Sequence, residues 1–315
     1  MKNKIIILFV LLPLFIFAQN EKYIQIGTFN IEWFPCKEDG EMMKKYGINL
    51  RYPPKGKPTD IKALFSLLKE LDIELIGVVE IVDPQMLQDS ARKYLGDQFK
   101  VIYAPSASSQ KVGFLYDSTE VQLIGKPEVY MDVALGPDTW LRPALRGYFK
   151  YKKNGFDFNA IVVHLKAAPS GLKKRERQWK ALARIMQEVP EKTNDKDLIL
   201  MGDFNNVSKL GIDEFKPVID SLNYYWAASE LADQNISSDF WQPDYKVERI
   251  EGSLIDHIFI SNDAKMEYVA NSTKAGGMCA EKMTEYEGEE IPEYYELISD
   301  HCPVFATFRV DADND

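Results

Sequence analysis

Acids, amides and histidines recur in this sequence where apolar runs begin or end. These residues are Asn30 in IQIGTFNI, Glu80 in LIGVVE, His164 in AIVVH, Asp203 and Asn205 in LILMGDFN, Asp256 in SLID, and Asp300 and His301 in ISDH. One such carboxylate could be a hydrogen-bonded structural group. Several unpaired buried carboxylates would each cost several kcal/mol, whereas a shared divalent cation can hold them close together. The pattern therefore indicates a metal-dependent site.

The chain has only three histidines, and two of them stand beside these acids. A single histidine at the end of a strand is more often structural than catalytic. An Asp and a His that can pair, however, form a common general base, because the carboxylate fixes the tautomer of the imidazole. His257 directly follows Asp256, so in a strand its side chain should point to the opposite face. We therefore expect His257 to be structural.

The elements that must position these residues are short strands alternating with helices. Apolar runs occur in YIQIGTFNI, ELIGVVEI, VGFLYD, FDFNAIVVHL, DLILMGDF, LIDHIFIS and PVFATFRV. Some alternate with polar residues and others are apolar throughout, which is typical of sheets buried on one or both faces. No repeat or linker divides the chain. We expect one α/β domain, with residues 37–58 and 271–292 as irregular surface loops.

Two segments have the periodicity of amphipathic helices. TDIKALFSLLKEL can be capped by Thr59 or Asp60, and its apolar face consists of Ile61, Leu64, Phe65, Leu68 and Leu71. KKRERQWKALARIMQEV places basic residues outside, and its inner side consists of Trp179, Leu182, Ile185 and Met186.

Residues 1–18 have the order of a secretory signal peptide: Lys2 and Lys4, an apolar core, and a small residue at Ala18. The alternative is an uncleaved anchor, but the apolar core is shorter than the roughly 20 residues that a spanning helix needs. We expect export to the periplasm or the medium, with residues 19–315 as one domain, no stable membrane anchor after cleavage, and a monomer. Loss of the two lysines takes the net charge from −10 to −12. This charge does not favour bulk attraction of a polyanion, although it can attract cations.

The cysteines are Cys36, Cys279 and Cys302, too few and too scattered for a disulfide framework or a zinc cluster. One bridge with a leftover thiol is compatible with this number. We favour Cys279 with Cys302, because both lie in the last fifth of the chain.

The segments TFNIEW, VVE, HLKA, GDFN, IDHIF and SDHCPV occur in the order found in a known family. From Ile24 to Val310 the sequence resembles the endonuclease/exonuclease/phosphatase superfamily, which includes deoxyribonuclease I-like nucleases, inositol polyphosphate phosphatases and neutral sphingomyelinases. GDFN and SDH, together with an upstream Asn and Glu, are the specific part of the match. The resemblance implies a four-layer α/β sandwich, in which two packed mixed β-sheets are flanked by helices.

The resemblance also implies roles for individual residues. Glu80 would be the main metal ligand, supported by Asn30 and Asp300. Asp203 and Asn205 would contact the metal, the attacking water or the phosphoryl group. Since the ligands are oxygens and amides, Mg²⁺ is the expected ion, with Mn²⁺ as a substitute.

His301, oriented by Asp256, resembles the general base, and His164 resembles a second histidine that protonates the leaving oxygen or binds a phosphate oxygen. Deoxyribonuclease I-like members give this second histidine an acidic partner where this chain has Gln110 or Lys111. Arg142 occupies the place of a phosphate-binding arginine, with spacing one residue tighter.

The implied function is that of a secreted metal-dependent phosphodiesterase, and we favour an endonuclease acting on DNA or RNA. The first alternative is a phosphatase or phosphodiesterase of a small or lipid phosphate. The second is a non-catalytic binding protein on the same scaffold. A basic group consistent with a nucleic-acid substrate consists of Lys173, Lys174, Arg175 and Arg177, with Arg51 and Tyr52 in the first long loop. The same run would also suit a solvated helix face. The sequence leaves open DNA against RNA, endo- against exonuclease action, and one metal ion against two.

Overall fold

The computed structural model describes residues 23–35, 44–47, 58–136, 139–153, 155–193, 195–244, 246–311 and 313. The expected signal peptide, Cys36, Arg51 and Tyr52 lie outside these residues, as does most of the expected loop 37–58. The described chain forms two six-stranded sheets and one small three-stranded sheet.

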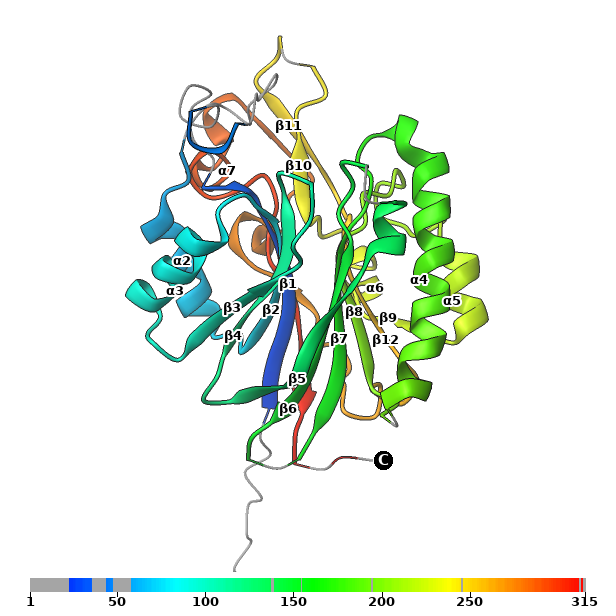
Figure 1. Ribbon diagram of the computed structural model, residues 1–315. Coiled ribbons are helices and arrows are strands. Elements are labelled where there is room, and N and C mark those ends of the chain that lie inside the picture. Colours follow the sequence, from blue (N-terminus) through cyan, green and yellow to red (C-terminus); the bar gives the residue numbers. More distant parts are fainter. Residues whose placement is uncertain are drawn as a thin grey trace, which may run out of the picture.

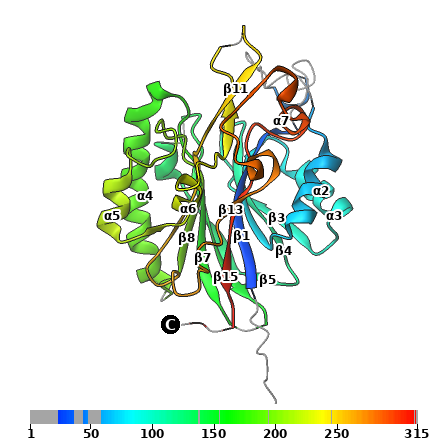
Figure 2. The same ribbon diagram turned by 180° about the vertical axis from the view of Figure 1, so that it is seen from behind.

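The first large sheet has the strand order β13-β15-β1-β2-β4-β3. Its strands are β1 (Tyr23–Phe34), β2 (Leu75–Ile81), β3 (Phe99–Tyr103), β4 (Lys111–Asp117), β13 (Lys274–Ala275) and β15 (Val304–Arg309). β1 runs parallel to β2 and antiparallel to β15, so the sheet is mixed. Figure 2 shows β13, β15 and β1 side by side.

The second large sheet has the order β5-β6-β7-β8-β12-β9. Its strands are β5 (Val121–Tyr130), β6 (Ala144–Tyr151), β7 (Asp157–His164), β8 (Leu198–Asp203), β9 (Tyr225–Trp226) and β12 (Asp256–Ile260). β7 and β8 are parallel, whereas β8 and β12 are antiparallel. The two sheets pack face to face through β1 and β2 against β7 and β8.

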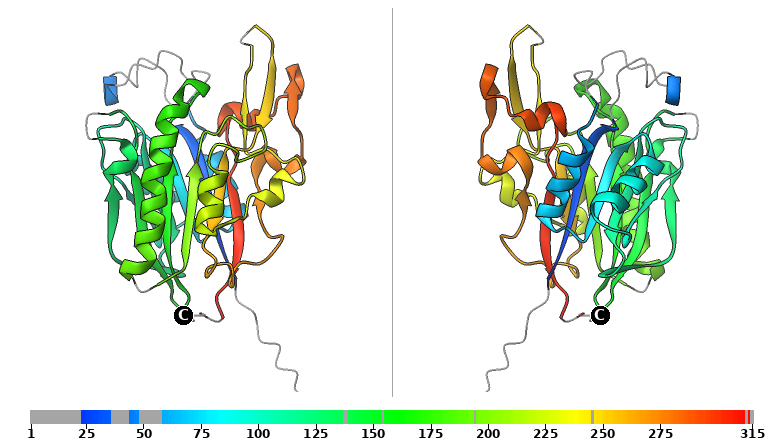
Figure 3. Two further views of the ribbon diagram at one scale, coloured as in Figure 1. Left: turned by 90° about the vertical axis from the view of Figure 1, so that its right-hand side faces the viewer. Right: turned by 90° about the vertical axis from the view of Figure 1, so that its left-hand side faces the viewer.

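Helices cover both outer faces of this pair of sheets (Figures 1 and 3). The helices α2 (Ile61–Leu71) and α3 (Pro84–Tyr94) lie on the first sheet, and α4 (Leu172–Thr193) and α5 (Lys216–Leu222) lie on the second. The expected four-layer α/β sandwich is therefore confirmed. In the part of the chain that the structure describes, no helix is long and apolar enough to cross a membrane.

The central strands are apolar on both faces because each lies between two layers. In β2, Leu75 and Val79 join the core between the sheets, while Ile76 and Val78 join the core under α2 and α3. In β8, Ile199 and Met201 face the other sheet, and Leu198 and Leu200 face α4. A continuous apolar run such as LILM thus contributes side chains both to the core between the sheets and to the core under the helices.

The two expected helices are present with most of their expected faces. Asp60, and not Thr59, caps α2 by accepting a hydrogen bond from Ala63 N at 2.9 Å. In α4 the expected inner residues are buried, but Arg175 is buried with them. Its Nε lies 2.7 Å from Glu214 Oε2 and its Nη2 lies 2.9 Å from Glu214 Oε1. The expectation that Arg175 meets phosphates is wrong, because a buried carboxylate already occupies its guanidinium.

Residues 271–292 are more regular than expected. The short strand β14 (Glu285–Glu287) pairs with β11 (Arg249–Ser253), which pairs with β10 (Asp239–Trp241). These strands are too short to produce a periodic sequence signal, and their partners lie far apart along the chain. Cys279 and Cys302 form a disulfide, as we favoured. The remaining short elements are η1 (Met131–Ala134), η2 (Pro169–Gly171), α6 (Ser229–Ala232), η3 (Gly277–Glu281), η4 (Gly288–Glu290) and α7 (Glu293–Leu297).

Arg175→Ala should lower the free energy of unfolding by about 3 kcal/mol, because it leaves the Glu214 carboxylate buried without its cation. Lys174→Ala, which changes an exposed neighbour, should stay within about 0.5 kcal/mol of the parent. Urea unfolding followed by circular dichroism measures both. Equal stability of the two variants would contradict the structural role of Arg175.

Candidate functional site

The expected site residues meet at one edge of the sandwich, where the parallel pairs β1/β2 and β7/β8 end. Asn30 Nδ2 donates to Asp203 Oδ2 at 3.1 Å, and this hydrogen bond joins β1 of one sheet to β8 of the other. Figure 1 shows these strand ends at the top of the molecule, below β10 and β11. The site therefore depends on both sheets and on how they pack.

The sequence GDFN places Asp203 through a close approach of two strands. Gly202 has φ +142°, and a Cβ there would lie 2.0 Å from Val163 O, so only glycine fits. Asp203 then stands beside His164 of β7 and opposite Asp256 of β12. Asn205 follows at φ 51°, and its N–H donates to Asp203 Oδ1 at 2.9 Å. This tight turn holds the carboxylate and the amide at the same edge.

Glu80 is placed by an irregularity in its strand. The pairing of β2 with β4 shifts between Val78 and Ile81, and Glu80 has φ 63°. Such a conformation is energetically costly for a residue other than glycine. It turns the Glu80 side chain away from the direction that the regular alternation of side chains along β2 would give it. Glu80 Oε2 accepts a hydrogen bond from Trp33 N at 3.0 Å. Glu80 Oε1 lies 3.6 Å from His164 Nε2.

His301 and Asp256 form the pair that the resemblance implied. His301 Nδ1 lies 2.8 Å from Asp256 Oδ2, which also accepts from Ser238 Oγ at 2.8 Å. His301 Nε2 faces Asn30 Nδ2 at 3.3 Å. Burial opposes charge on this imidazole, but the adjacent Asp256 carboxylate raises the pKa of His301 well above its usual value. The amide of Asn30 is a donor, so its contact with Nε2 fits the neutral imidazole, in which Nδ1–H donates to Asp256 and Nε2 is the atom that can accept a proton.

Burial raises the pKa of Asp203 to about 8, against the opposing effect of His301, and Asp256 and Glu80 raise it further. Burial, followed by repulsion from Asp300, raises the pKa of Glu80. A divalent cation would relieve this repulsion, and carboxylate and amide oxygens are the donors that Mg²⁺ prefers. Among the described residues, no group of three or more His, Cys, Asp or Glu has the arrangement of a metal site. The residues fit Mg²⁺ because their donor atoms are oxygens and their negative charges are not balanced. They do not form a preformed coordination site.

His164 has no acidic partner at its second nitrogen. Its Nε2 lies 3.3 Å from Asp203 Oδ2, while its buried Nδ1 has no hydrogen-bond partner among the described residues. Lys111, at the place where related nucleases have an acid, donates to Ser108 O and Ser109 O instead. Burial, and then the charge of Arg142, lower the pKa of His164 well below its usual value. A neutral imidazole suits hydrogen bonding to a phosphate oxygen better than protonation of a leaving group.

Arg142 is buried beside the acids. Its Nε donates to His164 O at 3.2 Å and its Nη2 donates to Leu165 O at 2.5 Å. Burial lowers the pKa of Arg142, and the charges of Glu80 and Asp203 oppose that effect. The guanidinium therefore holds the end of β7 in place through these two hydrogen bonds, and it also brings a positive charge to the site.

The sequence did not reveal Asp239 and Ser299. Asp239 is buried opposite His301 and accepts a hydrogen bond from Ser253 Oγ; burial raises its pKa to about 7. Ser299 Oγ donates to Asn30 O at 2.8 Å and accepts from His301 N at 3.0 Å, which ties β1 to the segment that carries His301. Both residues lie in short polar segments without an apolar run, so no strand signal marks them.

His257 lies apart from this cluster, as expected. Its Nδ1 accepts from Trp226 Nε1 at 3.1 Å, and its Nε2 lies 2.9 Å from Asn206 Oδ1. It packs against Phe204, Phe215 and Phe259 on the face of the sheet covered by α4 and α5. Burial lowers the pKa of His257 to about 3, so it stays neutral.

A pocket of about 380 Å³ adjoins the site. Asn205 and Asp239 form its inner wall, and Val207, Trp241 and Ile255 give it apolar sides. The indole of Trp241 is 49% exposed, so it is available to a ligand. This pocket can hold an organic group attached to a phosphate at the site.

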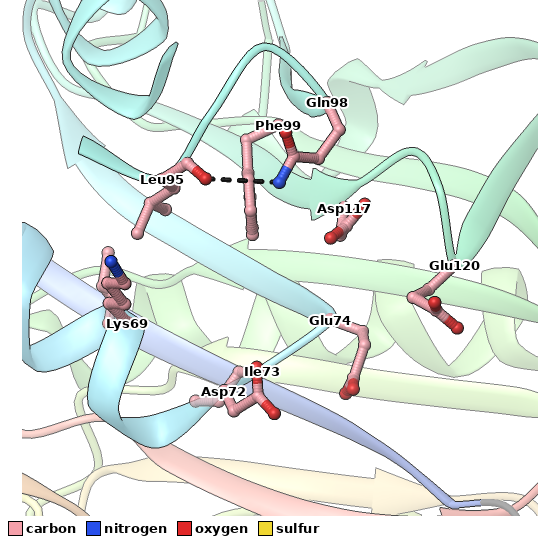
Figure 4. Close-up of a pocket in the computed structure, with 10 residues that line it drawn as sticks. Lys69, Asp72, Ile73, Glu74, Leu95, Gln98, Phe99, Asp117 and Glu120 are labelled. Atoms are coloured by element: carbon pink, nitrogen blue, oxygen red, sulfur yellow. Dashed lines mark hydrogen bonds between the residues drawn. The ribbon is translucent and has the colours of Figure 1, made fainter. Parts of the chain in front are cut away.

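A second pocket lies at the opposite end of β2 (Figure 4). Its acids are Asp72, Glu74, Asp117 and Glu120, with Lys69 at the rim. The residues that line this pocket include no histidine and no arginine, and none of them belongs to the cluster described above. We therefore take the edge that carries His301 as the candidate site.

Comparisons with known proteins identify the family of this chain. The model of the endonuclease/exonuclease/phosphatase family matches residues 27–301. No curated protein matches the chain. Similar solved structures include an endonuclease/exonuclease/phosphatase family protein from Bacteroides thetaiotaomicron, with a TM-score of 0.59, 16% identity, and coverage of 92% of this chain and 99% of that one.

Two further similar structures carry more specific names. Mannosyl-6-phosphatase from B. thetaiotaomicron has a TM-score of 0.57 and 16% identity, and the match covers 90% of this chain and 98% of that one. TDP2 from D. rerio, complexed with a single-strand DNA product, has a TM-score of 0.62 and 14% identity, with coverage of 92% and 100%. At these identities the similarity shows the shared fold alone.

Glu74→Gln should stabilise the protein at alkaline pH. Burial raises the pKa of Glu74 to about 7 from an ordinary 4.5, so the folded state binds the proton more tightly than the unfolded state. The stabilisation from that proton is complete below pH 4.5 and is lost as the pH rises through about 7. The variant should exceed the parent by up to about 3 kcal/mol near pH 8 and show no advantage near pH 4.

Urea unfolding at the two pH values measures this difference, with the exposed Glu70→Gln as the control. An advantage of Glu74→Gln of the same size at both pH values would contradict the assignment.

Proposed function

We propose that this chain, which belongs to the endonuclease/exonuclease/phosphatase family, is an exported, Mg²⁺-dependent phosphodiesterase that cleaves nucleic acid. The family typically hydrolyses phosphoester bonds. The observation that carries the proposal is the hydrogen-bonded pair of His301 and Asp256, with His301 Nε2 directed at Asn30 and Asp203.

In this arrangement His301 Nε2 accepts a proton from the attacking water, and Asp256 stabilises the imidazolium that forms. The amide of Asn205 and the neutral imidazole of His164 can donate to phosphoryl oxygens. Arg142, which is buried next to His164, adds positive charge to the site. Glu80, Asn30 and Asp300 would hold Mg²⁺, which when bound supplies charge that stabilises the phosphoryl oxygens.

The substrate assignment rests on what surrounds the site. The pocket with Trp241 offers an aromatic surface next to the phosphate position, as a nucleoside requires, and a TDP2 structure of the same fold contains a single-strand DNA product. A small phosphate is the second candidate, since a mannosyl-6-phosphatase also shares the fold. A purely binding role is less well supported, because the expected catalytic residues lie together in hydrogen-bonding geometry.

Two features support export. The first 18 residues have the order of a signal peptide. The disulfide between Cys279 and Cys302 suits an oxidising compartment outside the cytosol. We further propose that the mature protein is a monomer.

Removal of divalent cations should abolish hydrolysis of bis(p-nitrophenyl) phosphate, and Mg²⁺ or Mn²⁺ should restore it. Glu80→Gln should raise the Mg²⁺ concentration needed for half-maximal rate, because it removes a charged ligand. The release of p-nitrophenolate measures both effects. Full activity in EDTA, or restoration by Zn²⁺ alone, would remove the metal assignment.

His301→Ala and Asp203→Asn should each lower kcat by about 10² or more, since each removes a group that acts on the developing charge. Both variants should unfold near the thermal midpoint of the parent. His257→Ala should instead lower the midpoint, because it leaves Trp226 and Asn206 without their partner. If His301→Ala unfolds and His257→Ala only loses activity, the two histidines have been assigned the wrong roles.

A further inference from the structure

The outer face of α4 carries a line of cations. Lys173, Arg177, Lys180 and Arg184 are exposed and follow one another at intervals of four, three and four residues. At 3.6 residues per turn this spacing places them on one side of the helix, opposite the buried face that packs on the second sheet. We call these four residues the α4 stripe. Figure 3 shows α4 along the outside of the sandwich.

The cations at the start of α4 do not serve the stability of the helix. Lys173 and Lys174 stand in its first turn, where the helix dipole disfavours cations, whereas Glu188 near the C-terminal end pairs with Arg184 and Lys192. The whole chain has a net charge of −10, so the stripe is a local reversal of the overall charge. A bound anion would be stabilised by this arrangement.

The stripe borders a groove of about 500 Å³. Its far wall consists of Leu135 and Gly136, directly after η1, and its near wall includes Arg177 and Lys180. Arg184 forms an ion pair with Asp132, so its charge is already compensated. No ion pair of Lys173, Arg177 or Lys180 occurs among the described residues, which leaves three cations for a ligand.

An exposed aromatic side chain connects this groove with the candidate site. Thr139 Oγ donates to Gly136 O at 3.1 Å, which holds Thr139 beside the residue that lines the groove. The next residue, Trp140, is 76% exposed, an unusual state for a tryptophan. Two residues later the chain reaches Arg142, which is buried at the site. Gly136 therefore borders the groove, Trp140 presents an indole, and Arg142 lies at the site.

Positive charge also continues from the site to α4. Lys166 follows the end of β7, and burial, then Arg142, Lys174 and Arg175, lower its pKa. Lys166 thus lies within electrostatic reach of both the site and the first turns of α4. Cations in a row with an exposed aromatic ring are the usual components of surfaces that bind single-stranded nucleic acid.

We propose that Trp140 and the α4 stripe form a binding track for single-stranded nucleic acid that leaves the candidate site beside Lys166. The track turns from the edge of the sheets to the outer face of α4. A single strand can follow that turn freely, whereas a duplex, with a persistence length of about 150 base pairs, must be bent to follow it, which costs free energy. The track extends the proposed function: it binds the part of the polymer that lies beyond the scissile phosphate.

The test is the affinity of the mature protein for a fluorescein-labelled 12-nucleotide strand in EDTA, where hydrolysis does not interfere. The variant Lys173→Gln/Arg177→Gln/Lys180→Gln should weaken binding at least tenfold and reduce the slope of log K against log salt by about 2. Trp140→Ala should weaken binding about tenfold, and Trp140→Phe should recover most of it, because a ring that stacks remains. DNA and RNA strands and a 12-base-pair duplex are compared in the same assay.

The matched control is Lys62→Gln/Lys69→Gln/Arg92→Gln, which removes the same three charges from exposed positions of α2 and α3 on the other side of the sandwich. It should change single-strand affinity less than threefold. All these variants should hydrolyse bis(p-nitrophenyl) phosphate at the parent's rate, which tests the proposed function separately from the track.

Three outcomes would overturn the track: equal losses in the control and the stripe variant, duplex binding as tight as single-strand binding, or no binding of any strand by the parent. Binding of phosphatidylserine vesicles that depends on the stripe, without a matching dependence for the oligonucleotide, would assign this surface to a membrane and would also overturn it.

Discussion

Repulsion between buried carboxylates is the constraint on which this molecule depends. Glu80, Asp203, Asp239 and Asp256 converge at one edge of the sandwich around His164 and His301, with the partly exposed Asp300 beside them. His301 and the amide of Asn30 offset part of this repulsion, but burial, and then the neighbouring carboxylates, still raise the pKa values of Glu80, Asp203 and Asp239. A fold that retains such a cluster must stabilise it from outside, because each unpaired buried charge costs several kcal/mol.

The sandwich provides that stabilisation through its two cores. β2 and β8 are fixed by apolar contacts on both of their faces, so the carboxylates of Glu80 and Asp203 at their ends cannot separate. The segment with His301 is held in a different way. Ser299 binds it to β1, and the disulfide of Cys302 with Cys279 follows directly after the histidine. The general base therefore sits on a segment that is cross-linked to the rest of the chain, and rigid placement of this kind is what preorganised catalysis requires.

The sequence predicted most of the fold, because strands between two layers leave continuous apolar runs and α2 and α4 have a clear helical period. It also placed Asn30, Glu80, Asp203, Asp256 and His301 near one another, since each follows or begins such a run. Asp239 escaped notice because its strand has only three residues, Asp239–Trp241. The burial of Arg175 could not be predicted for a different reason: an ion pair with Glu214 has no local sequence signal, so the residue resembles one more exposed cation.

Diffraction from a crystal soaked in Mn²⁺ tests the central claim most directly, because the anomalous signal of manganese locates the ion without reference to activity. The account predicts one strong peak beside Glu80 and Asp300, and loss of that peak in the Glu80→Gln variant. A peak only in the pocket of Asp72, Glu74, Asp117 and Glu120, or none at either place, would contradict the claim that the carboxylates around His301 are gathered to bind a divalent cation.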